Sequence, residues 1–486
     1  MHSAGHDFPS DHSQAFPKFR RCLLLLLCVI LGLKALIFFT RATLVVLYPF
    51  EWSTMDGYFV YHGLRLISGE PIYFDTNSIL MPFEYVPLYP AAIGILARVF
   101  GPGVWYERCF SLACSLAISA LVMRAVGRST GDKTAAAAAG FIFFGPAALS
   151  VWFIVRGIDI FAVLLGLIGV SIVAEDEEGS RLRLTLATAV FALAFFAKQT
   201  AAFPAAAAVV YVGCRNFKKG LFMGSFLALT TGAAFLLLQV LSGGWFYENA
   251  FVTTMSNPYY PRILCGLLRD FFLCLVIAFP VALFQAFRGA GRRPNIWTLY
   301  FLFTLLSALL AGKLGAALTY FVPLFSAACI CLGLLLGDRS FFARKPKTCL
   351  VMLTALLLQG MLFYEDHVPV PSQADSARAR VLDAYVKDHP GDILTERIDS
   401  FAVVNGRELN VEAVQLPILI MRRKYDPQAL LHLVENKEFS LIVYSSIYFG
   451  GIPALRQAIF ENYTVVDRIS LGLFYGETTF LVLVPQ

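Results

Sequence analysis

Charged and amide side chains occur at the ends of long apolar runs in this 486-residue sequence. Polar side chains at membrane depth are costly, so they are functional candidates there. A carboxylate can act as a general base toward a hydroxyl group, whereas lysine and arginine bind phosphate. These residue types therefore indicate group transfer that involves an anionic substrate. The candidates are Asp56, Glu84, Tyr85, Arg156, Asp159, Lys198, Gln199, Asn257 and Lys313.

The composition predicts a polytopic membrane protein. Hydrophobic residues make up 58% of the chain, charged residues make up 15%, and the mean hydropathy is +0.68. Soluble domains have about 45–50% apolar and about 25% charged residues. The net charge of +6 does not call for a nucleic-acid partner, because basic residues in short loops set membrane topology. The ten cysteines form no CxxC pair, and we interpret them as small apolar residues.

Eleven apolar runs predict about eleven transmembrane helices. A further run, 86–100, is short and carries Arg98. If it crossed the membrane, the later basic clusters would lie outside, against the positive-inside rule. We therefore expect 86–100 to be an amphipathic helix on the outer surface. The predicted spans are 22–40, 107–124, 134–153, 158–174, 183–197, 200–214, 220–241, 265–287, 296–311, 316–336 and 348–364.

This topology divides the chain into three parts. Residues 1–21 are a cytoplasmic tail, and 22–364 are the transmembrane domain, with a long first outer loop at 41–106. Residues 365–486 form an extracytoplasmic domain. There "DILTE", "FSLIVYS", "TVVDRI" and "TFLVLVPQ" are typical of strands, and "SARARVLDAYVKDH" and "DPQALLHLVENK" are typical of helices. This alternation predicts a small α/β domain.

The candidate residues all fall on the outer face in this topology. Two acids and several bases on one face fit an anionic, lipid-linked substrate. Lysine and arginine would stabilise the departing phosphate, and a carboxylate would deprotonate the acceptor. These residues predict transfer of a sugar from a lipid-phosphate donor to an extracytoplasmic acceptor. A transporter or flippase of lipid-linked sugars is the alternative, and it usually needs repeated halves, which are not found. A non-catalytic scaffold is a third interpretation.

The order of the motifs resembles the GT-C glycosyltransferases, which use polyprenyl-phosphate sugars and include aminoarabinose and protein mannosyltransferases. The resemblance is closest to the bacterial RgtA/B/C/D-like group. It is carried by "YHGLRLISGEPIYFD", "YVPLYP", "VRGID", "AKQT", "SNPYY", "KLGAALTYF" and the tail phrase "ILTERIDSFAVVNGRELNVEAVQLP". It implies a bacterial inner-membrane enzyme. The family's catalytic base falls on Asp56, its second acid on Asp159, and its phosphate-binding bases on Arg156, Lys198 and Lys313.

Each assignment has a simpler alternative. Asp56 and Asp159 could cap helices, and Arg156 and Lys198 could snorkel or pair with an acid such as Asp159. Lys313 could lie in a plain turn. Many relatives carry two adjacent acids in the first loop, whereas this chain has only Asp56 in "MDG". One carboxylate is a poor divalent-cation site. A divalent metal is therefore possible but not favoured, and we expect no other cofactor.

Overall fold

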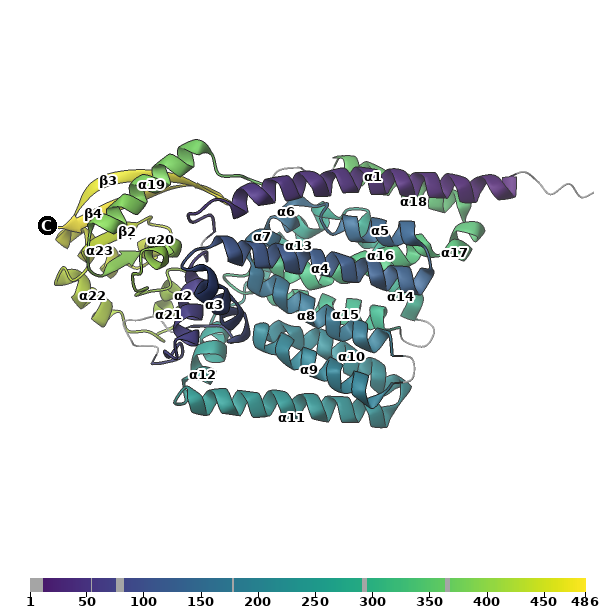
Figure 1. Ribbon diagram of the computed structural model, residues 1–486, viewed down its shortest axis with the longest axis horizontal. Coiled ribbons are helices and arrows are strands. Elements are labelled where there is room, and N and C mark those ends of the chain that lie inside the picture. The colour runs from purple at the N-terminus through teal and green to yellow at the C-terminus, as the bar shows by residue number, and fades with distance from the viewer. Residues whose placement is uncertain (1–11, 54, 76–82, 177–178, 291–294, 363–367) are drawn as a thin grey trace, which may run out of the picture.

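The computed structural model describes residues 12–53, 55–75, 83–176, 179–290, 295–362 and 368–486. A bundle of long helices forms one part of the molecule, and a smaller lobe with a sheet covers one of its ends (Figure 1). Two helices of the first loop, α2 (Tyr58–Ile67) and α3 (Leu88–Phe100), lie between the bundle and the lobe. The segment expected to be a juxtamembrane helix, 86–100, is therefore a helix at the end of the bundle.

The bundle helices follow the predicted apolar runs. They are α1 (His12–Val46), α4 (Trp105–Thr130), α5 (Lys133–Ile142), α6 (Ala147–Ser150), α7 (Trp152–Val155), α8 (Gly157–Ala174), α9 (Arg181–Ala197), α10 (Ala202–Arg215), α11 (Phe217–Leu241), α12 (Trp245–Tyr247), α13 (Pro261–Cys274), α14 (Ala278–Ala290), α15 (Ile296–Ala308), α16 (Val322–Gly337), α17 (Arg339–Arg344) and α18 (Pro346–Leu362). Short turns join them: 3-10 helices η1 (Gln199–Ala201), η3 (Leu309–Gly312) and η4 (Leu318–Phe321), and π-helix η2 (Glu248–Thr253).

Fewer helices qualify as membrane spans by length than the sequence predicts. In the described part of the chain, five helices are long and apolar enough, and a bent pair, Pro261–Cys274 with Ala278–Arg288, would make six. The other predicted runs form shorter helices or, at 134–153, the broken series α5 to α7. The structure is thus a helical polytopic membrane protein with five or six candidate spans. The count of eleven crossings remains a prediction.

A buried glutamine explains how the α13–α14 pair can bend by 96°. Breaking a helix leaves backbone groups without partners, which is costly in an apolar surrounding. Gln359 of α18 supplies those partners. Its Oε1 accepts from the amides of Ile277 and Ala278 at 2.7 and 2.9 Å, and its Nε2 donates to the Cys274 carbonyl at 3.3 Å. The bend is therefore held by a side chain about 80 residues further along the chain, as the separation of 82 between Ile277 and Gln359 shows.

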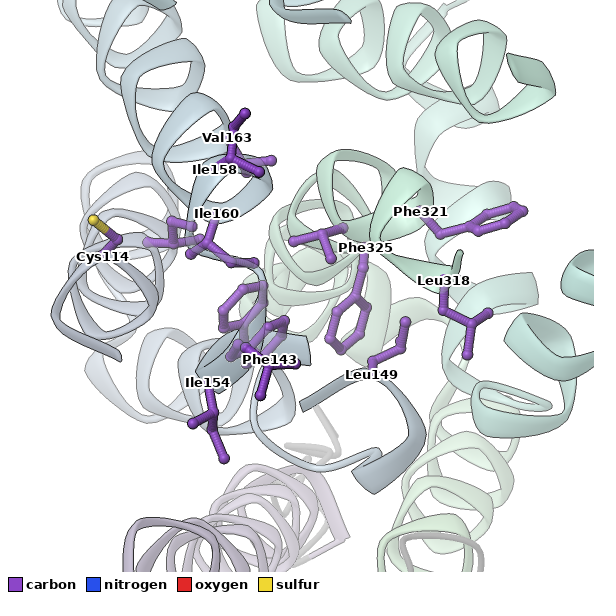
Figure 2. Close-up of a cluster of buried hydrophobic side chains, with 14 of the residues drawn as sticks. Cys114, Phe143, Leu149, Ile154, Ile158, Ile160, Val163, Leu318, Phe321 and Phe325 are labelled. Carbon is purple, nitrogen blue, oxygen red and sulfur yellow. The ribbon is translucent and has the colours of Figure 1, made fainter. Parts of the chain in front are cut away.

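An aromatic stack packs beneath the turn that carries two site candidates. The Phe143 ring stacks on Phe153 with centroids 4.5 Å apart and on Phe325 at 5.4 Å. These rings join α7, α16 and the C-terminal end of α5, and Ile158 of α8 lies in the same cluster (Figure 2). Packing at this density fixes the neighbouring backbone. The Arg156–Asp159 turn is thus positioned by the core below it.

The lobe contains a small mixed sheet with helices, as expected for an α/β unit near the C-terminus, and its described part is 368–486. Its sheet has the order β1-β2-β4-β3, with β1 and β2 parallel and the other pairs antiparallel. All four predicted strands and both predicted helices are present. The elements are α19 (Gln373–Asp388), β1 (Ile393–Thr395), α20 (Asp399–Val404), α21 (Leu416–Met421), α22 (Gln428–Glu435), β2 (Leu441–Tyr444), η5 (Phe449–Gly451), α23 (Pro453–Asn462), β3 (Tyr463–Leu473) and β4 (Gly476–Pro485).

The lobe docks onto the first loop through close backbone contact. A Cβ on Gly57, whose φ is +87°, would lie 2.6 Å from the Cα and amide nitrogen of Ser400. Only glycine allows this approach without strain. The Ser400 amide donates to Glu51 Oε2 at 2.8 Å, and the Phe50 and Phe401 rings stack with centroids 5.4 Å apart. The loop and the lobe therefore form one packed unit over the end of the bundle.

Candidate active site

Asp56 lies in a buried network in the first loop. Its Oδ2 accepts from the amides of Trp52 and Ser53, each at 2.8 Å, and from Arg108 Nη2 at 2.6 Å. Arg108 also donates to the carbonyls of Val45 and Tyr48, at 2.8 and 2.6 Å, and of Phe50, at 2.8 Å. The ion pair fixes the orientation of the carboxylate. Helix capping does not explain Asp56, because Gly57 is the N-cap of α2.

Arg108 is not among the residues predicted from the sequence, although the sequence carries a signal for it. Glu107 and Arg108 begin an apolar run that otherwise reads as a plain span. Both are buried, and the Tyr89 hydroxyl donates to Glu107 Oε1 at 3.0 Å. A Cβ on Gly157 would lie 2.0 Å from the same hydroxyl oxygen. Tyr89 therefore connects the region of Asp56 with the turn that carries Arg156 and Asp159.

Asp159 and Lys198 form a buried ion pair. The Lys198 ammonium donates to Asp159 Oδ1 and lies 4.6 Å from the centroid of the Tyr320 ring. Asp159 is in the first turn of α8, and Lys198 follows α9, so two helix ends bring them together. This pairing was one of the alternatives raised from the sequence. The N-cap position of α8 belongs to Arg156.

A cavity of about 300 Å³ lies beside this pair, at the bundle end covered by the lobe. Six of the nine predicted site residues line it: Glu84, Tyr85, Lys198, Gln199, Asn257 and Lys313. Asp159 lines a small adjoining pocket together with Lys198 and Tyr320. Asp56 and Arg156 do not line the cavity. The structure thus brings most of the predicted polar residues to one chamber.

Backbone and amide contacts hold the cavity wall around Lys313. Asn257 Nδ2 donates to the Leu314 carbonyl at 3.1 Å, and the Tyr260 amide donates to the Gly312 carbonyl at 2.8 Å. Gln199 Nε2 donates to the Ala250 carbonyl at 2.9 Å. Lys313 therefore sits in a segment clamped to the loop before α13.

The lobe contributes part of the cavity wall, which was not predicted from the sequence. Val414 and Gln415 line the cavity, and Gln415 Nε2 donates to Asn257 Oδ1 at 2.6 Å and to the Thr253 carbonyl at 3.3 Å. These polar contacts join the lobe to the end of η2 and to the loop that follows it. The only sequence signal was the tail phrase "ELNVEAVQLP", whose polar residues interrupt an apolar stretch.

Four buried acids follow the boundary between loop and lobe. Burial raises the pKa of Glu51, Glu84 and Asp399 well above its usual range, and neighbouring carboxylates raise it further. Burial also raises the pKa of Glu412 to about 7, against the opposing field of Arg156 and backbone hydrogen bonds. Glu84 is the member that lines the cavity, and its Oε2 is buried without a hydrogen-bond partner among the described residues.

Arg156 lies near this acidic boundary. Its guanidinium carbon is 5.7 Å from the centroid of the Trp152 ring. Its charge opposes the rise in the pKa of both Tyr85 and Glu412. Within the described ranges, no three His, Cys, Asp or Glu side chains are arranged to hold a metal ion. The expectation of a metal-free site stays a prediction.

Comparisons with known proteins agree with this architecture. Residues 82–245 match the model of the dolichyl-phosphate-mannose-protein mannosyltransferase family. No curated protein sequence matches the chain. The apo structure of ArnT from Cupriavidus metallidurans is similar, with a TM-score of 0.60 and 15% identity over 93% of this chain and 97% of that one.

Two further structures are similar over nearly the whole chain. The Archaeoglobus fulgidus oligosaccharyltransferase in complex with Zn and sulfate has a TM-score of 0.54 and 12% identity, covering 93% of this chain and 72% of that one. The arabinofuranosyltransferase AftD from Mycobacteria has a TM-score of 0.53 and 12% identity, covering 94% of this chain and 40% of that one. At these identities the likeness establishes the fold.

Proposed function

We propose that this chain, a multi-pass membrane glycosyltransferase of the GT-C type, takes a sugar from a polyprenyl-phosphate carrier and transfers it to an extracytoplasmic acceptor. The observation that carries the proposal is the cavity of about 300 Å³, where Lys198, Lys313 and Glu84 face a common space. A phosphate needs cations, and an acceptor hydroxyl needs a carboxylate. The cavity offers both.

Lys198 and Lys313 are the proposed donor-phosphate ligands. They come from separate turns of the bundle and line the same cavity. Asp159 holds Lys198 through their ion pair, so we assign Asp159 the role of positioning that ammonium. Arg156 adds positive charge from the adjacent turn. As the phosphate departs, preorganised cations stabilise the negative charge that develops on it.

The acceptor base is proposed to be Asp56, as the sequence predicts. Its carboxylate is held in one orientation by Arg108 and two amides, and a fixed orientation favours proton transfer in a defined geometry. Glu84 is the competing candidate, because it lines the cavity and carries a buried carboxylate oxygen without a hydrogen-bond partner among the described residues. Raising the pKa of a carboxyl also makes its ionised form a stronger base.

Reconstituted protein can test the proposal. In liposomes that contain a polyprenyl-phosphate sugar and a hydroxyl acceptor, a transferase forms product and releases lipid phosphate. A flippase would move labelled donor across the bilayer without consuming it. Donor that is moved but stays intact in the presence of acceptors of several classes would overturn the proposal.

Membrane orientation is proposed from charge. The basic loops place the N-terminus in the cytoplasm of a bacterial cell, which puts the first loop and the lobe outside the inner membrane. A membrane-impermeant thiol reagent should label a cysteine introduced at exposed Glu477 in intact spheroplasts. A cysteine introduced at exposed Lys133 should react only after the membrane is opened.

A further inference from the structure

A second, larger pocket lies at the opposite end of the bundle. Its volume is about 650 Å³, and it is lined by residues 18–24 of α1, by the start of α5 and by α17. In Figure 1 these elements meet at the end of the bundle farthest from the sheet lobe. The proposed transfer site is therefore separated from this pocket by the length of the helices.

The pocket carries an excess of positive charge. It is lined by five basic residues, Lys18, Arg20, Arg21, Lys133 and Arg339, and by one acid, Asp132. The carboxylate of Asp132 already has hydrogen-bond partners. Its Oδ1 accepts from the amides of Thr134 and Ala135, each at 3.1 Å, and its Oδ2 accepts from Arg20 at 3.0 Å. Within the described residues, none of the other four cations forms an ion pair with a carboxylate.

Arg20 is the buried cation of this pocket, and several contacts hold its side chain in place. The residue is only 8% exposed, and its guanidinium lies 4.7 Å from the centroid of the Phe342 ring. It donates to the Leu336 carbonyl as well as to Asp132. Its Nε is buried without a hydrogen-bond partner among the described residues. A buried donor without a hydrogen-bond partner is costly. An anionic ligand whose oxygen atoms accept from this donor would therefore be favoured.

The pocket lies where the candidate membrane span of α1 begins. The candidate span of α1 begins at Lys18, so the cations stand in its first turn. Leu25 and Leu26, one turn further along, are 47% and 49% exposed and would face acyl chains. Basic pockets between transmembrane helices bind anionic lipid headgroups. We propose that this pocket binds the headgroup of an anionic phospholipid. Its four cations without an ion-pair partner among the described residues suit a headgroup with two phosphates, such as cardiolipin.

Matched double variants test the site in phosphatidylcholine nanodiscs with and without cardiolipin. Lys133→Ala with Arg339→Ala removes two exposed cations of the pocket. At the usual contribution of a basic residue near an anionic surface, cardiolipin binding should weaken about 30-fold. Arg181→Ala with Lys218→Ala removes two exposed cations outside the pocket, at the starts of α9 and α11, and should leave binding within about 3-fold of the parent.

Native mass spectrometry would count retained cardiolipin, and the unfolding temperature would report its stabilising effect. Equal losses in the two double variants, or no loss in either, would overturn the site. Because both pairs are exposed, neither should change the unfolding temperature in phosphatidylcholine alone. Pyrophosphate without lipid distinguishes the source of the phosphate groups. If pyrophosphate raised the unfolding temperature of the parent protein as much as cardiolipin does, the ligand would be a soluble phosphate compound. The lipid proposal would then fail.

Discussion

Replacing Asp56 with Asn separates its structural role from its proposed chemical one. The carboxylate and Arg108 form an ion pair of 2.6 Å, with side chains only 3% and 1% exposed. Removing one partner of a buried pair costs about 3–5 kcal/mol. In this case Arg108 keeps three carbonyl acceptors, and an Asn oxygen can still accept from the Trp52 and Ser53 amides. We therefore expect a loss of unfolding free energy near the lower bound, about 3 kcal/mol.

The expected loss of activity is larger than the loss of stability can explain. A general base contributes about 10²–10⁴-fold to the rate. The assay is single-turnover sugar transfer in liposomes at saturating donor and acceptor, divided by the folded fraction of each sample. On that scale Asp56→Asn should be slower by about 10²–10⁴-fold, because Asn cannot take up the acceptor proton.

Asp375→Asn is the matched structural control. Asp375 accepts from the amides of Ser372 and Gly472 and from Arg378, but it does not line the cavity. This variant should lose stability and keep its rate per folded molecule. If Asp56→Asn also kept its rate while Glu84→Gln lost it, the base would be Glu84 and the assignment of Asp56 would be refuted.

Three further changes have defined outcomes. Lys313→Ala should weaken donor binding about 10–100-fold, the usual contribution of a hydrogen bond to a charged group; an unchanged donor KM would argue against phosphate contact. Gly57→Ala should lower the unfolding temperature and speed proteolysis of the lobe, because its Cβ would lie 2.6 Å from Ser400 at φ +87°. Gly69→Ala is the control, because Gly69 has φ +79° and a Cβ there would meet nothing within 4 Å. This variant has only an unfavourable backbone conformation, so the unfolding temperature and the proteolysis rate should change less. Burial raises the pKa of Glu412 from 4.5 to about 7, so the folded state binds its proton more tightly and stability should fall as pH rises from about 4.5 to about 7. Thermal unfolding measured across that pH window should show that the stability of Glu412→Gln falls less with pH than the stability of the parent. An equal dependence on pH in both proteins would contradict the role of Glu412.

Local patterns predicted the helices and the lobe because hydropathy and alternation are local properties. The runs 220–241 and 296–311 coincide with α11 and α15 to within a few residues, and "FSLIVYS" contains β2. The bend between α13 and α14 could not be predicted in this way. It depends on Gln359, which reads as an ordinary polar residue of a later span. A contact of this kind has no trace in the sequence near the bend.

The candidate site was predicted by residue type, whereas its pairings required the fold. The sequence placed the candidates on one face, and six of them line one cavity. The partner of Asp56 is 52 residues away, in a run that was interpreted as a simple span. The lobe's Gln415 reaches Asn257 across 158 residues. Both contacts arise from docking of the first loop and the lobe over the bundle, and neither leaves a local pattern.

The Asp159–Lys198 pair constrains how the cavity can perform transfer. Protonating an acid that binds an ammonium removes the negative charge of the pair, and Lys198 would then be a buried charge without a countercharge, which is costly. A donor phosphate that approaches Lys198 avoids this cost, because it adds a second acceptor to an ammonium that has three donor hydrogens. The pair is therefore suited to hold phosphate and unsuited to deprotonate an acceptor. Protonation of Asp56 meets a similar cost at Arg108, reduced by the three carbonyls to which this guanidinium also donates. Glu84 on the cavity wall forms no ion pair among the described residues, so Asp56 and Glu84 remain the two candidates for the acceptor base.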